Sequence, residues 1–374
     1  METRNRLAEL RAERGVSAAQ LANTIGISRQ TVYAIEAGSY VPNTSVSLKI
    51  ACVLDVSVEE IFQLQEEPSA DQKSIEATLL PTAERALPGQ PLRLCVVNGN
   101  AVAVCSEPSV LGISVSEGTL LSGAKKGVER NVVKVGVADE SWKSPDRLLI
   151  AGCDPSVPFV QHHLSRLNID LLVSYQNSSS ALELLKQDLV HIAGTHLVDK
   201  TSGEFDLARI KEIFGKSSVA VICYATWEEG LTVAKGNPKR ISGIADLVRK
   251  DVKIVNREVG AACRKLLESL LREKGIRGRQ VAGYDDVAFG HMPAARMVQT
   301  SQVDCCITTR AAARVLGLDF IPLARRPYHL ITRKKHLALP TVQAMLNLFR
   351  RASFRREVEA STGYDMKAAG NLLQ

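Results

Sequence analysis

The chain of 374 residues is poor in aromatic side chains and lacks the patterns of membrane spans and disulfide frameworks. Phe, Trp and Tyr make up 5% of it, so aliphatic side chains must supply the cores. No run of about 18 apolar residues occurs, which argues against a transmembrane helix. The eight cysteines are scattered without a CxxC pair, as is typical of reduced thiols. The sequence therefore predicts a cytoplasmic protein with no membrane partner.

Acidic residues are also missing from one long stretch. Residues 321–356 hold nine Lys or Arg and no Asp or Glu, and the net charge of the chain is +7. A basic balance favours an anionic partner such as nucleic acid. A basic run is more often a solvated protein face, and the alternative is an added phosphate-contacting surface.

Residues 1–66 contain only short helical patterns, which predicts an all-α domain. The first pattern, Arg4–Glu13, places Leu7 and Leu10 on one face. Serine residues at helix-start positions precede the four later patterns: Ser17, Ser28, Ser45 and Ser57. Gln20 and Glu60 lie three residues after two of these serines, which predicts capping boxes.

The helix, turn and helix over residues 17–38 have the geometry that a DNA major groove accepts. The first residues of the second helix then reach the edges of the bases. Arginine pairs bidentately with guanine and glutamine with adenine. We therefore expect contacts to double-stranded DNA from Ser17, Gln20, Ser28, Arg29, Gln30, Thr31, Tyr33 and Tyr40.

Residues 4–64 resemble the lambda-repressor/Cro type of helix-turn-helix domain, also called the xenobiotic-response-element (XRE) type. The stretches that carry the resemblance are Ser17–Ala22, Ile27–Val32, Ile35–Gly38, Tyr40–Pro42, Leu48–Ala51 and Val56–Phe62. The resemblance implies a sequence-specific regulator with a DNA operator as its partner. It also implies a homodimer, because such domains read paired half-sites.

The rest of the chain divides into three parts. Residues 67–90 are polar and proline-containing, which indicates a linker. Residues 91–146 predict a small β unit, with a hairpin around Asn98-Gly99 and a strand over Val132–Val137. From residue 147 to 374, strands alternate with helices, which predicts a doubly wound α/β domain.

The predicted elements of this α/β domain can be given by their ranges. The strands are Leu148–Gly152, Ile169–Tyr175, Ile192–Gly194, Ser218–Tyr224, Lys253–Val255, Cys305–Thr308 and Phe320–Pro322. The helices are Val157–Leu167, Ala181–Lys186, Ile244–Arg249, Ala261–Glu273, Pro293–Gln299 and Arg310–Leu316.

Three loops of the α/β domain, each between a strand and a helix, suggest an anion site. They are Ala151–Ser156, Gln176–Ser180 and Asn256–Arg264. Helix N-termini attract anions, and open α/β sheets bind ligands where strand ends converge. Ordinary helix capping is the alternative for each loop. The predicted ligand-binding residues are Asp154, Ser178, Ser179, Ser180, His196, Asn256, Arg257, Gly260, Ala261, Arg264, Tyr284 and His291.

Residues 147–365 resemble the two-lobed periplasmic-binding-protein-like domain that is fused to helix-turn-helix modules and to molybdopterin-biosynthesis proteins. The matching stretches include Asp188–Asp199, Gly203–Phe205, Gly236–Lys239, Val255–Glu258, Leu318–Leu323 and Gly363–Asp365. Relatives of this kind include molybdate- and tungstate-binding proteins. The resemblance implies a small, anionic effector, such as a molybdate- or tungstate-like oxyanion or a related metabolite.

One departure from the family pattern concerns the loop after Asn256-Arg257. The family continues with Gly-Ser-Gly-Thr-Arg character, whereas Val259–Arg264 keeps a glycine and the arginine but lacks the hydroxyls. The loss of hydroxyl donors weakens a dedicated molybdate or tungstate pocket. A changed ligand and binding through backbone N–H groups alone both remain open.

Catalytic, metal and cofactor sites are not predicted. The sequence shows no nucleophile–base–orienter set, phosphate-binding P-loop or metal quartet. His191 and His196 lie five residues apart without a third ligand nearby in sequence. Two alternatives to an effector-binding regulator stay open. One is a redox-responsive regulator that uses Cys263 or another thiol instead of a ligand, and the other is an enzyme of molybdenum-cofactor metabolism with a DNA-binding appendage.

Overall fold

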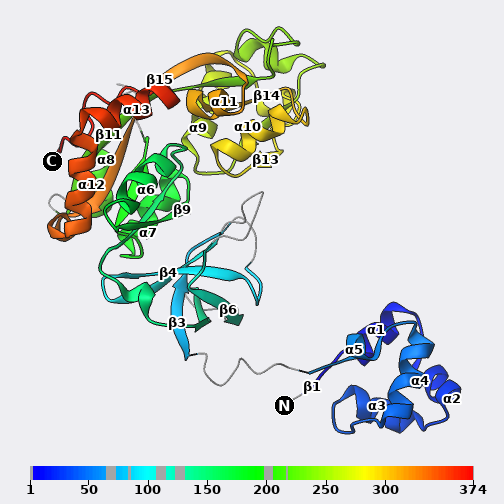
Figure 1. Ribbon diagram of the computed structural model, residues 1–374. Helices are drawn as coiled ribbons and strands as arrows, with labels where there is room; N and C mark the ends of the chain where they lie inside the picture. The colour runs from blue at the N-terminus through cyan, green and yellow to red at the C-terminus, as the bar shows by residue number, and fades with distance from the viewer. Residues whose placement is uncertain are drawn as a thin grey trace. The chain divides into compact units, whose positions relative to one another are not determined.

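The structure is a computed structural model that describes residues 3–64, 73–82, 86–106, 115–122, 131–197, 205–215 and 218–373. The chain forms two compact units, residues 1–72 and 73–374, and each is described by itself (Figure 1). In the described ranges, no helix is long and apolar enough to cross a membrane. The predicted division between a β unit and a sensing domain at residue 147 falls within the second unit.

The first unit is a helical bundle. Its helices are α1 (Leu7–Glu13), α2 (Ala18–Ile25), α3 (Arg29–Glu36), α4 (Thr44–Leu54) and α5 (Val58–Ile61). Leu7, Leu21, Val32, Ile35 and Ile50 are fully buried between them. Both predicted capping boxes are confirmed, because the Ser17 and Ser57 hydroxyls accept from the N–H groups of Gln20 and Glu60 at 3.2 Å.

Three predicted helix ends in this unit are wrong. Strands β1 (Thr3–Asn5) and β2 (Phe62–Leu64) pair antiparallel, so the first helix starts after Arg4 and the fifth ends before Leu64. Pairing of β1 with β2 gives hydrogen-bond partners to backbone N–H and C=O groups at the two ends of the bundle, which unpaired helix ends would leave without partners. Helix α4 is capped by Asn43, whose side chain accepts from the Val46 N–H at 2.9 Å, rather than by Ser45.

The second unit begins with a closed β-barrel. Its strands are β3 (Lys73–Leu79), β4 (Pro91–Val97), β5 (Asn100–Cys105), β6 (Gly118–Ser122) and β7 (Val132–Val137). The predicted hairpin is confirmed: Asn98 and Gly99 both have positive φ, as a two-residue turn requires. The expected linker over residues 67–90 is wrong in its middle, because β3 pairs with both β5 and β7. The alternation of Ile75, Ala77 and Leu79 was the available signal.

An eight-stranded sheet follows, in the order β13-β12-β14-β11-β15-β10-β8-β9. Its strands are β8 (Arg147–Gly152), β9 (Asp170–Tyr175), β10 (Ile192–Thr195), β11 (Val219–Val233), β12 (Ile254–Arg257), β13 (Val287–Ala288), β14 (Cys305–Thr309) and β15 (Asp319–Arg333). The helices are α6 (Val157–Ser165), α7 (Ser178–Lys186), α8 (Leu207–Phe214), α9 (Ala262–Glu273), α10 (His291–Gln299), α11 (Arg310–Val315), α12 (Pro340–Arg350) and α13 (Ala352–Thr362). Short 3₁₀ helices are η1 (Ser141–Lys143), η2 (Ile244–Val248), η3 (Gly278–Gln280) and η4 (Lys334–Ala338).

The seven predicted strands and six predicted helical segments all fall on observed elements, with Ile244–Arg249 forming 3₁₀ rather than α-helix. Two strands are far longer than predicted, since β11 and β15 are each 15 residues long and pair antiparallel along their length. They join two lobes, lobe 1 built on β8, β9 and β10 and lobe 2 built on β12, β13 and β14. Register shifts at Cys223/Ala225 and Glu229/Gly230 mark the stretch between the lobes.

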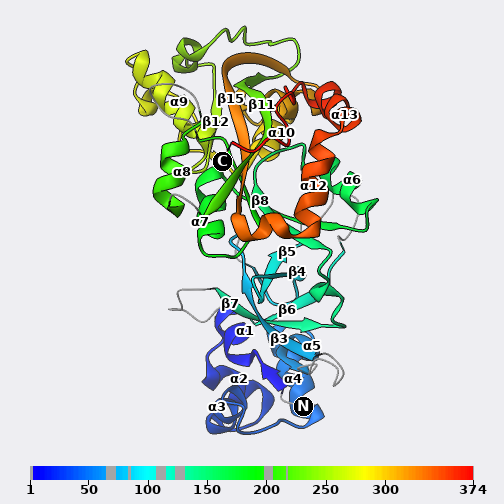
Figure 2. The same ribbon diagram turned by 90° about the vertical axis from the view of Figure 1, so that its left-hand side faces the viewer.

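The two faces of the lobe 1 sheet are covered differently. Leu148 and Ile150 of β8 face a core shared with α6, α12 and α13, whereas Leu149 and Ala151 face α7, α8 and the barrel. This alternation is the period of two that a strand imposes. Figure 2 shows the barrel beneath the lobe 1 sheet, with β4 and β5 nearest to it. The barrel is therefore part of the second unit's packed core.

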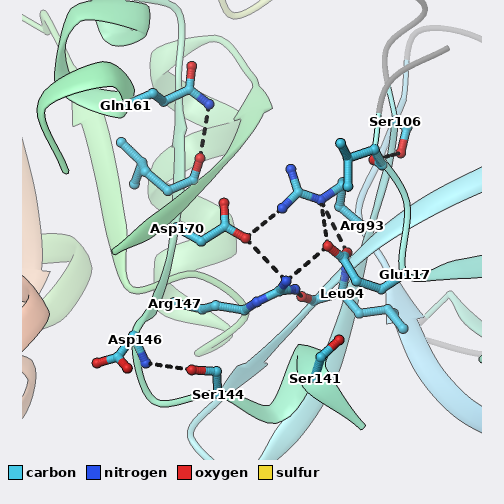
Figure 3. Close-up of polar contacts among 12 residues, drawn as sticks. Arg93, Leu94, Ser106, Glu117, Ser141, Ser144, Asp146, Arg147, Gln161 and Asp170 are labelled. Atoms are coloured by element: carbon cyan, nitrogen blue, oxygen red, sulfur yellow. Dashed lines mark hydrogen bonds and ion pairs between the residues drawn. The ribbon is translucent and has the colours of Figure 1, made fainter. Parts of the chain in front are cut away.

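The junction between barrel and lobe 1 also carries an ion-pair network (Figure 3). The Glu117 carboxylate lies 2.9 Å from Nη2 of Arg147 and 3.0 Å from Nε of Arg93. Asp170, at the start of β9, accepts from Arg93 at 2.6 Å. Arg147 also donates to the Leu94 carbonyl oxygen at 2.8 Å. Barrel and lobe are thus fixed by directional bonds as well as by apolar packing.

Candidate ligand site between the two lobes

Polar and aromatic side chains from both lobes and from the strand that joins them meet in a buried group. We call it the interlobe cluster and define it as Cys153, His196, Trp227, Glu229, Arg257 and His291. Cys153 and His196 follow β8 and β10, Arg257 ends β12, and His291 begins α10. These are the carboxyl ends of parallel strands and a helix N-terminus, the usual place for ligands in open α/β sheets. Each side chain is at most 8% exposed.

His196 and Glu229 form a fully buried ion pair. Nδ1 of His196 lies 2.7 Å from Oε1 of Glu229, which also accepts from Nε1 of Trp227 at 3.3 Å. Burial alone lowers the pKa of His196, but Glu229 and Cys153 outweigh it and raise the pKa to about 10. Burial raises the pKa of Glu229, and His196 brings it below the ordinary value. Both partners are therefore charged at neutral pH.

Arg257 is the second buried cation of the cluster. Its Nε and Nη2 donate to the two carboxylate oxygens of Glu258 at 2.9 and 3.0 Å. Within the described part of the chain, four buried atoms of the cluster have no hydrogen-bond partner: Arg257 Nη1, His291 Nε2, Glu229 Oε2 and His196 Nδ1, the last of which contacts Glu229 as an ion pair. Burial, followed by the charges of Arg257 and His196, lowers the pKa of His291 well below its ordinary value. His291 is therefore a neutral imidazole with a free nitrogen.

Tyr328 closes the cluster from β15. Its ring stacks on Trp227 with centroids 4.4 Å apart, and its hydroxyl lies against the backbones of Gly152 and Gly194. A Cβ at residue 194 would approach the hydroxyl to 1.8 Å, and one at residue 152 to 2.5 Å. The two glycines therefore leave room for the Tyr328 hydroxyl beside β8 and β10.

Two sulfur atoms border the histidines. Sγ of Cys153 lies 3.9 Å from Nε2 of His196, and Sγ of Cys263 lies 3.9 Å from Nδ1 of His291. Cys153, His196 and His291 each offer one ligand atom, and these atoms lie within 4.8 Å of one another. The prediction of no metal site considered only residues close in sequence, whereas these three side chains come together through the fold.

Of the predicted ligand residues, His196, Arg257 and His291 come together in the interlobe cluster. Asp154 is buried beside it, where its carboxylate accepts from the Ser156 and Tyr364 hydroxyls at 2.6 and 2.9 Å. Burial raises the pKa of Asp154. This carboxyl belongs to a hydrogen-bonded support for lobe 1, with Tyr224 attached through Ser156 at 2.7 Å.

The serines of the predicted Gln176–Ser180 loop mainly form hydrogen bonds with backbone groups, and one of these bonds joins the two lobes. The Ser178 hydroxyl accepts from the His196 N–H at 3.2 Å, and the Ser180 N–H donates to the Asn177 side chain. The Ser179 hydroxyl donates to the Gly260 carbonyl oxygen at 3.3 Å, from lobe 1 to lobe 2. The positive φ of Gly260 allows this turn.

The remaining predicted residues lie in or beside the loop that follows Arg257. The Asn256 side chain accepts from the Arg257 N–H, and the Ala261 N–H donates to the Glu258 carbonyl oxygen. Arg264 donates to the Arg257 carbonyl oxygen and to Glu268, and the Tyr284 hydroxyl also bonds Glu268. Arg264 and Tyr284 are thus placed as supports of the β12–α9 loop. No observation tests whether any of the predicted residues binds a ligand.

Three residues that were not predicted from the sequence complete the cluster, namely Cys153, Trp227 and Glu229, and a fourth, Tyr328, packs against it. Cys153 lay in a loop already identified, which was a usable signal. Trp227 and Glu229 lie beyond the predicted end of their strand at Tyr224. Nothing in their local pattern indicated that β11 continues between the lobes.

The predicted DNA-contacting residues occupy α2, α3 and the segment after α3. Arg29, Gln30 and Tyr33 are exposed on α3, and Nη2 of Arg29 donates to the Tyr33 hydroxyl at 3.0 Å. Ser17, Gln20, Ser28 and Thr31 take part in the caps of α2 and α3 and keep exposed or half-buried side chains. Tyr40 is 47% exposed. Their part in DNA binding stays a prediction.

Fold and site together define a two-lobed binding-protein domain joined to a helix-turn-helix. Residues 160–350 match the PBP superfamily domain and residues 7–61 match the helix-turn-helix family model. The chain therefore belongs to the PBP superfamily and carries a helix-turn-helix domain, as predicted. The molybdate-specific branch is not part of this match.

Two proteins of Bacillus subtilis (strain 168) are similar to this chain, each over a different part of its length. It is 31% identical to the uncharacterized protein YvgK, over 60% of this chain and 73% of that protein. It is 45% identical to the uncharacterized HTH-type transcriptional regulator YgzD, over 17% of this chain and 97% of that protein. Among solved structures, Peb3 from Campylobacter jejuni is 16% identical with a TM-score of 0.40, covering 58% of this chain and 98% of Peb3.

Proposed function

We propose that this protein is a sequence-specific DNA-binding transcription regulator that holds a small, anionic effector in the interlobe cluster. The effector class comprises molybdate- and tungstate-like oxyanions and related metabolites. One observation carries the effector site: Arg257 is 2% exposed, and in the described residues its Nη1 has no hydrogen-bond partner. A buried charged donor without an acceptor is unfavourable, and an anionic ligand supplies the acceptor.

The charges around the cluster support a small ligand. Glu258 and Glu229 already balance Arg257 and His196, so the ligand meets directed donors rather than a large excess of positive charge. Because the side chains come from both lobes, a ligand here stabilises one arrangement of the lobes over others.

Effector binding alters operator affinity by changing the spacing of the paired helix-turn-helix domains in a homodimer. Such a coupling is reciprocal, so operator DNA changes effector affinity by the same factor as effector changes operator affinity. The two half-sites lie about one helical turn of DNA apart.

The DNA-binding part is tested by operator selection with the full chain, followed by fluorescence anisotropy. Replacing Arg29 and Gln30 by Ala removes two base-reading side chains without touching the core, so operator binding falls by about 1–3 kcal/mol for each lost bidentate contact. The matched control is Glu13→Ala, an exposed change on α1. Operator affinity that survives in the double variant contradicts the assigned recognition helix.

The effector part is tested by thermal shift of the full chain with molybdate, tungstate, sulfate, phosphate and small carboxylates. Selective stabilisation that follows ligand concentration over its dissociation constant supports the proposal. Arg257→Lys weakens this shift because it removes the planar guanidinium, whereas the control Arg249→Lys, at a half-buried arginine paired with Asp251, leaves it unchanged. The absence of any shift with these anions contradicts the anionic class.

The redox-responsive alternative is less favoured. Cys263 is 1% exposed, and burial raises its pKa well above the ordinary thiol value. Reactive thiols are exposed and acidic, whereas buried neutral thiols are inert. Relatives of the helical domain that are named HTH-type transcriptional regulators agree with a regulator rather than an enzyme.

A further inference from the structure

We infer that Cys153, His196 and His291 form a transition-metal site that joins the two lobes. The class of ion is one that accepts a thiolate and two imidazoles, such as Zn²⁺ or Co²⁺. The inference rests on the proposed function for the place of the effector, and it deepens it by naming a metal ion as the group that the effector binds.

The geometry is close to that of a coordinated ion. The three ligand atoms lie within 4.8 Å of one another, and Cys153 Sγ and His196 Nε2 are 3.9 Å apart. Tetrahedral coordination with bonds of about 2.0–2.3 Å places ligand atoms roughly 3.5 Å apart. Binding therefore requires only small side-chain movements.

The surroundings of both histidines suit coordination. His196 directs Nδ1 at the Glu229 carboxylate, which leaves Nε2 toward Cys153. This is the carboxylate–histidine arrangement that orients imidazole ligands and increases their basicity. In the described chain, Nε2 of His291 is buried without a hydrogen-bond partner, so a nitrogen lone pair is available from the opposite lobe.

Three protein ligands leave the fourth position of a tetrahedral ion open, as in sites that bind an exchangeable ligand. On binding, the ion replaces the Cys153 thiol proton and the His196 Nε2 proton, which pass to solvent. A divalent ion on one thiolate keeps one positive charge at the metal, whereas Glu258 balances Arg257 and Glu229 lies behind His196. An anionic donor in the open fourth position binds to this local charge, which connects the metal site to an anionic effector.

The site provides a physical means of holding the lobes together. Cys153 and His196 belong to lobe 1, whereas His291 belongs to lobe 2. Coordination across the boundary adds metal–ligand bonds to weak contacts such as the 3.3 Å bond from Ser179 to Gly260. A metal ion therefore favours the arrangement of lobes in which the three side chains meet.

The test is a Co²⁺ titration of the reduced, metal-free full chain, read by absorption. The expected result is one ion per chain, with a thiolate-to-cobalt charge-transfer band that Zn²⁺ displaces. Cys153→Ser removes this band, and His291→Gln raises the dissociation constant at least tenfold. Cys52→Ser, an exposed thiol on α4, leaves the spectrum unchanged. Circular dichroism confirms that each variant is folded.

The Co²⁺ absorption of the wild-type chain is measured first, so the test does not depend on whether a variant folds. A wild-type titration without the band, or a folded Cys153→Ser variant that keeps it, overturns the metal site. Operator binding measured in parallel separates the two proposals. Anion-dependent operator binding without the Co²⁺ band refutes only the metal site, whereas a Co²⁺ site in a protein that binds no operator DNA refutes only the proposed function.

Discussion

Nδ1 of His196 lies 2.7 Å from Oε1 of Glu229, and both side chains are essentially inaccessible to solvent. The histidine follows β10 of lobe 1, whereas the glutamate belongs to β11, at the register shift between the lobes. A buried ion pair of this kind is costly to break, because the remaining charge has no water to solvate it. It fixes the orientation of the ring that faces Cys153.

Glu229→Gln tests this relationship through stability. The substitution removes the carboxylate but leaves His196 buried, so we expect the second unit to lose about 3 kcal/mol or more, the range for a buried pair that loses one partner. Urea unfolding of the full chain measures the loss. The matched control is Glu212→Gln, which alters an exposed pair with Arg209 and is expected to change nothing measurable. Equal stability of Glu229→Gln and wild type would show that the pair contributes nothing.

A second prediction concerns the space around the Tyr328 hydroxyl. Gly152→Ala places a Cβ 2.5 Å from that oxygen, while its next nearest neighbour is at 3.4 Å. We therefore expect a loss of about 1–3 kcal/mol, as for overpacked cores. Tyr328→Phe removes the clashing oxygen and restores most of the loss in the double variant, which a double-mutant cycle by urea unfolding measures.

The control for this cycle is Gly243→Ala, where the new Cβ meets nothing within 4 Å and φ is extended. If Tyr328→Phe fails to rescue Gly152→Ala, the hydroxyl is not the group that requires glycine at this position.

The third prediction concerns acid sensitivity at the junction of barrel and lobe. Burial raises the pKa of Glu117, but bonds from Arg147 and the Leu94 N–H bring it below the ordinary value. A carboxylate with a lowered folded-state pKa stabilises the fold above the unfolded value, near 4.3, and loses this contribution as pH falls through the folded value. We therefore expect the free energy of unfolding to decrease as the pH is lowered past about 4.

Glu117→Gln should lower stability at pH 7 by about 1–3 kcal/mol, because two arginines lose a charged acceptor. It should also flatten the dependence of melting temperature on pH between 7 and 3, measured by circular dichroism. Glu273→Gln, at an exposed site on the same unit, is the control and should keep the wild-type profile. A variant at Glu117 with the wild-type acid profile would place the titrating group elsewhere.

The fourth prediction concerns the helical unit. Nε of Arg11 on α1 lies 2.6 Å from Oε1 of Glu36, at the end of α3, and both side chains are largely buried. Glu36→Gln should weaken this tie by about 1–3 kcal/mol. Amide hydrogen exchange by mass spectrometry should then be faster in peptides of residues 7–61. The exposed pair of Arg6 and Glu9 offers the control Glu9→Gln, for which unchanged exchange is expected.

Local chemistry was enough to predict much of the architecture. Ser17 with Gln20 and Ser57 with Glu60 specify helix starts by bonds within four residues, and Asn98-Gly99 specifies a hairpin by its tolerance of positive φ. Strand and helix alternation after residue 147 depends on periodicity alone. The two domain families were recognisable for the same reason, because their motifs are short and continuous in sequence.

The candidate site could be predicted only in part. His196, Arg257 and His291 were identified because they follow strands or begin a helix, positions that the alternating pattern makes visible. Glu229 and Tyr328 were not, because β11 and β15 continue far past their apolar starts and owe their length to pairing with each other. Long-range pairing leaves no mark in the local sequence.

By itself, then, the sequence determined the helix-turn-helix, the α/β class and the loops that carry functional side chains, since propensity, capping and periodicity are local. Only the tertiary structure decided that Cys153, His196 and His291 meet, because 43 and 95 positions separate them along the chain and sheet order alone brings them together. The same holds for β3, whose place in the barrel depends on partners at residues 100–105 and 132–137.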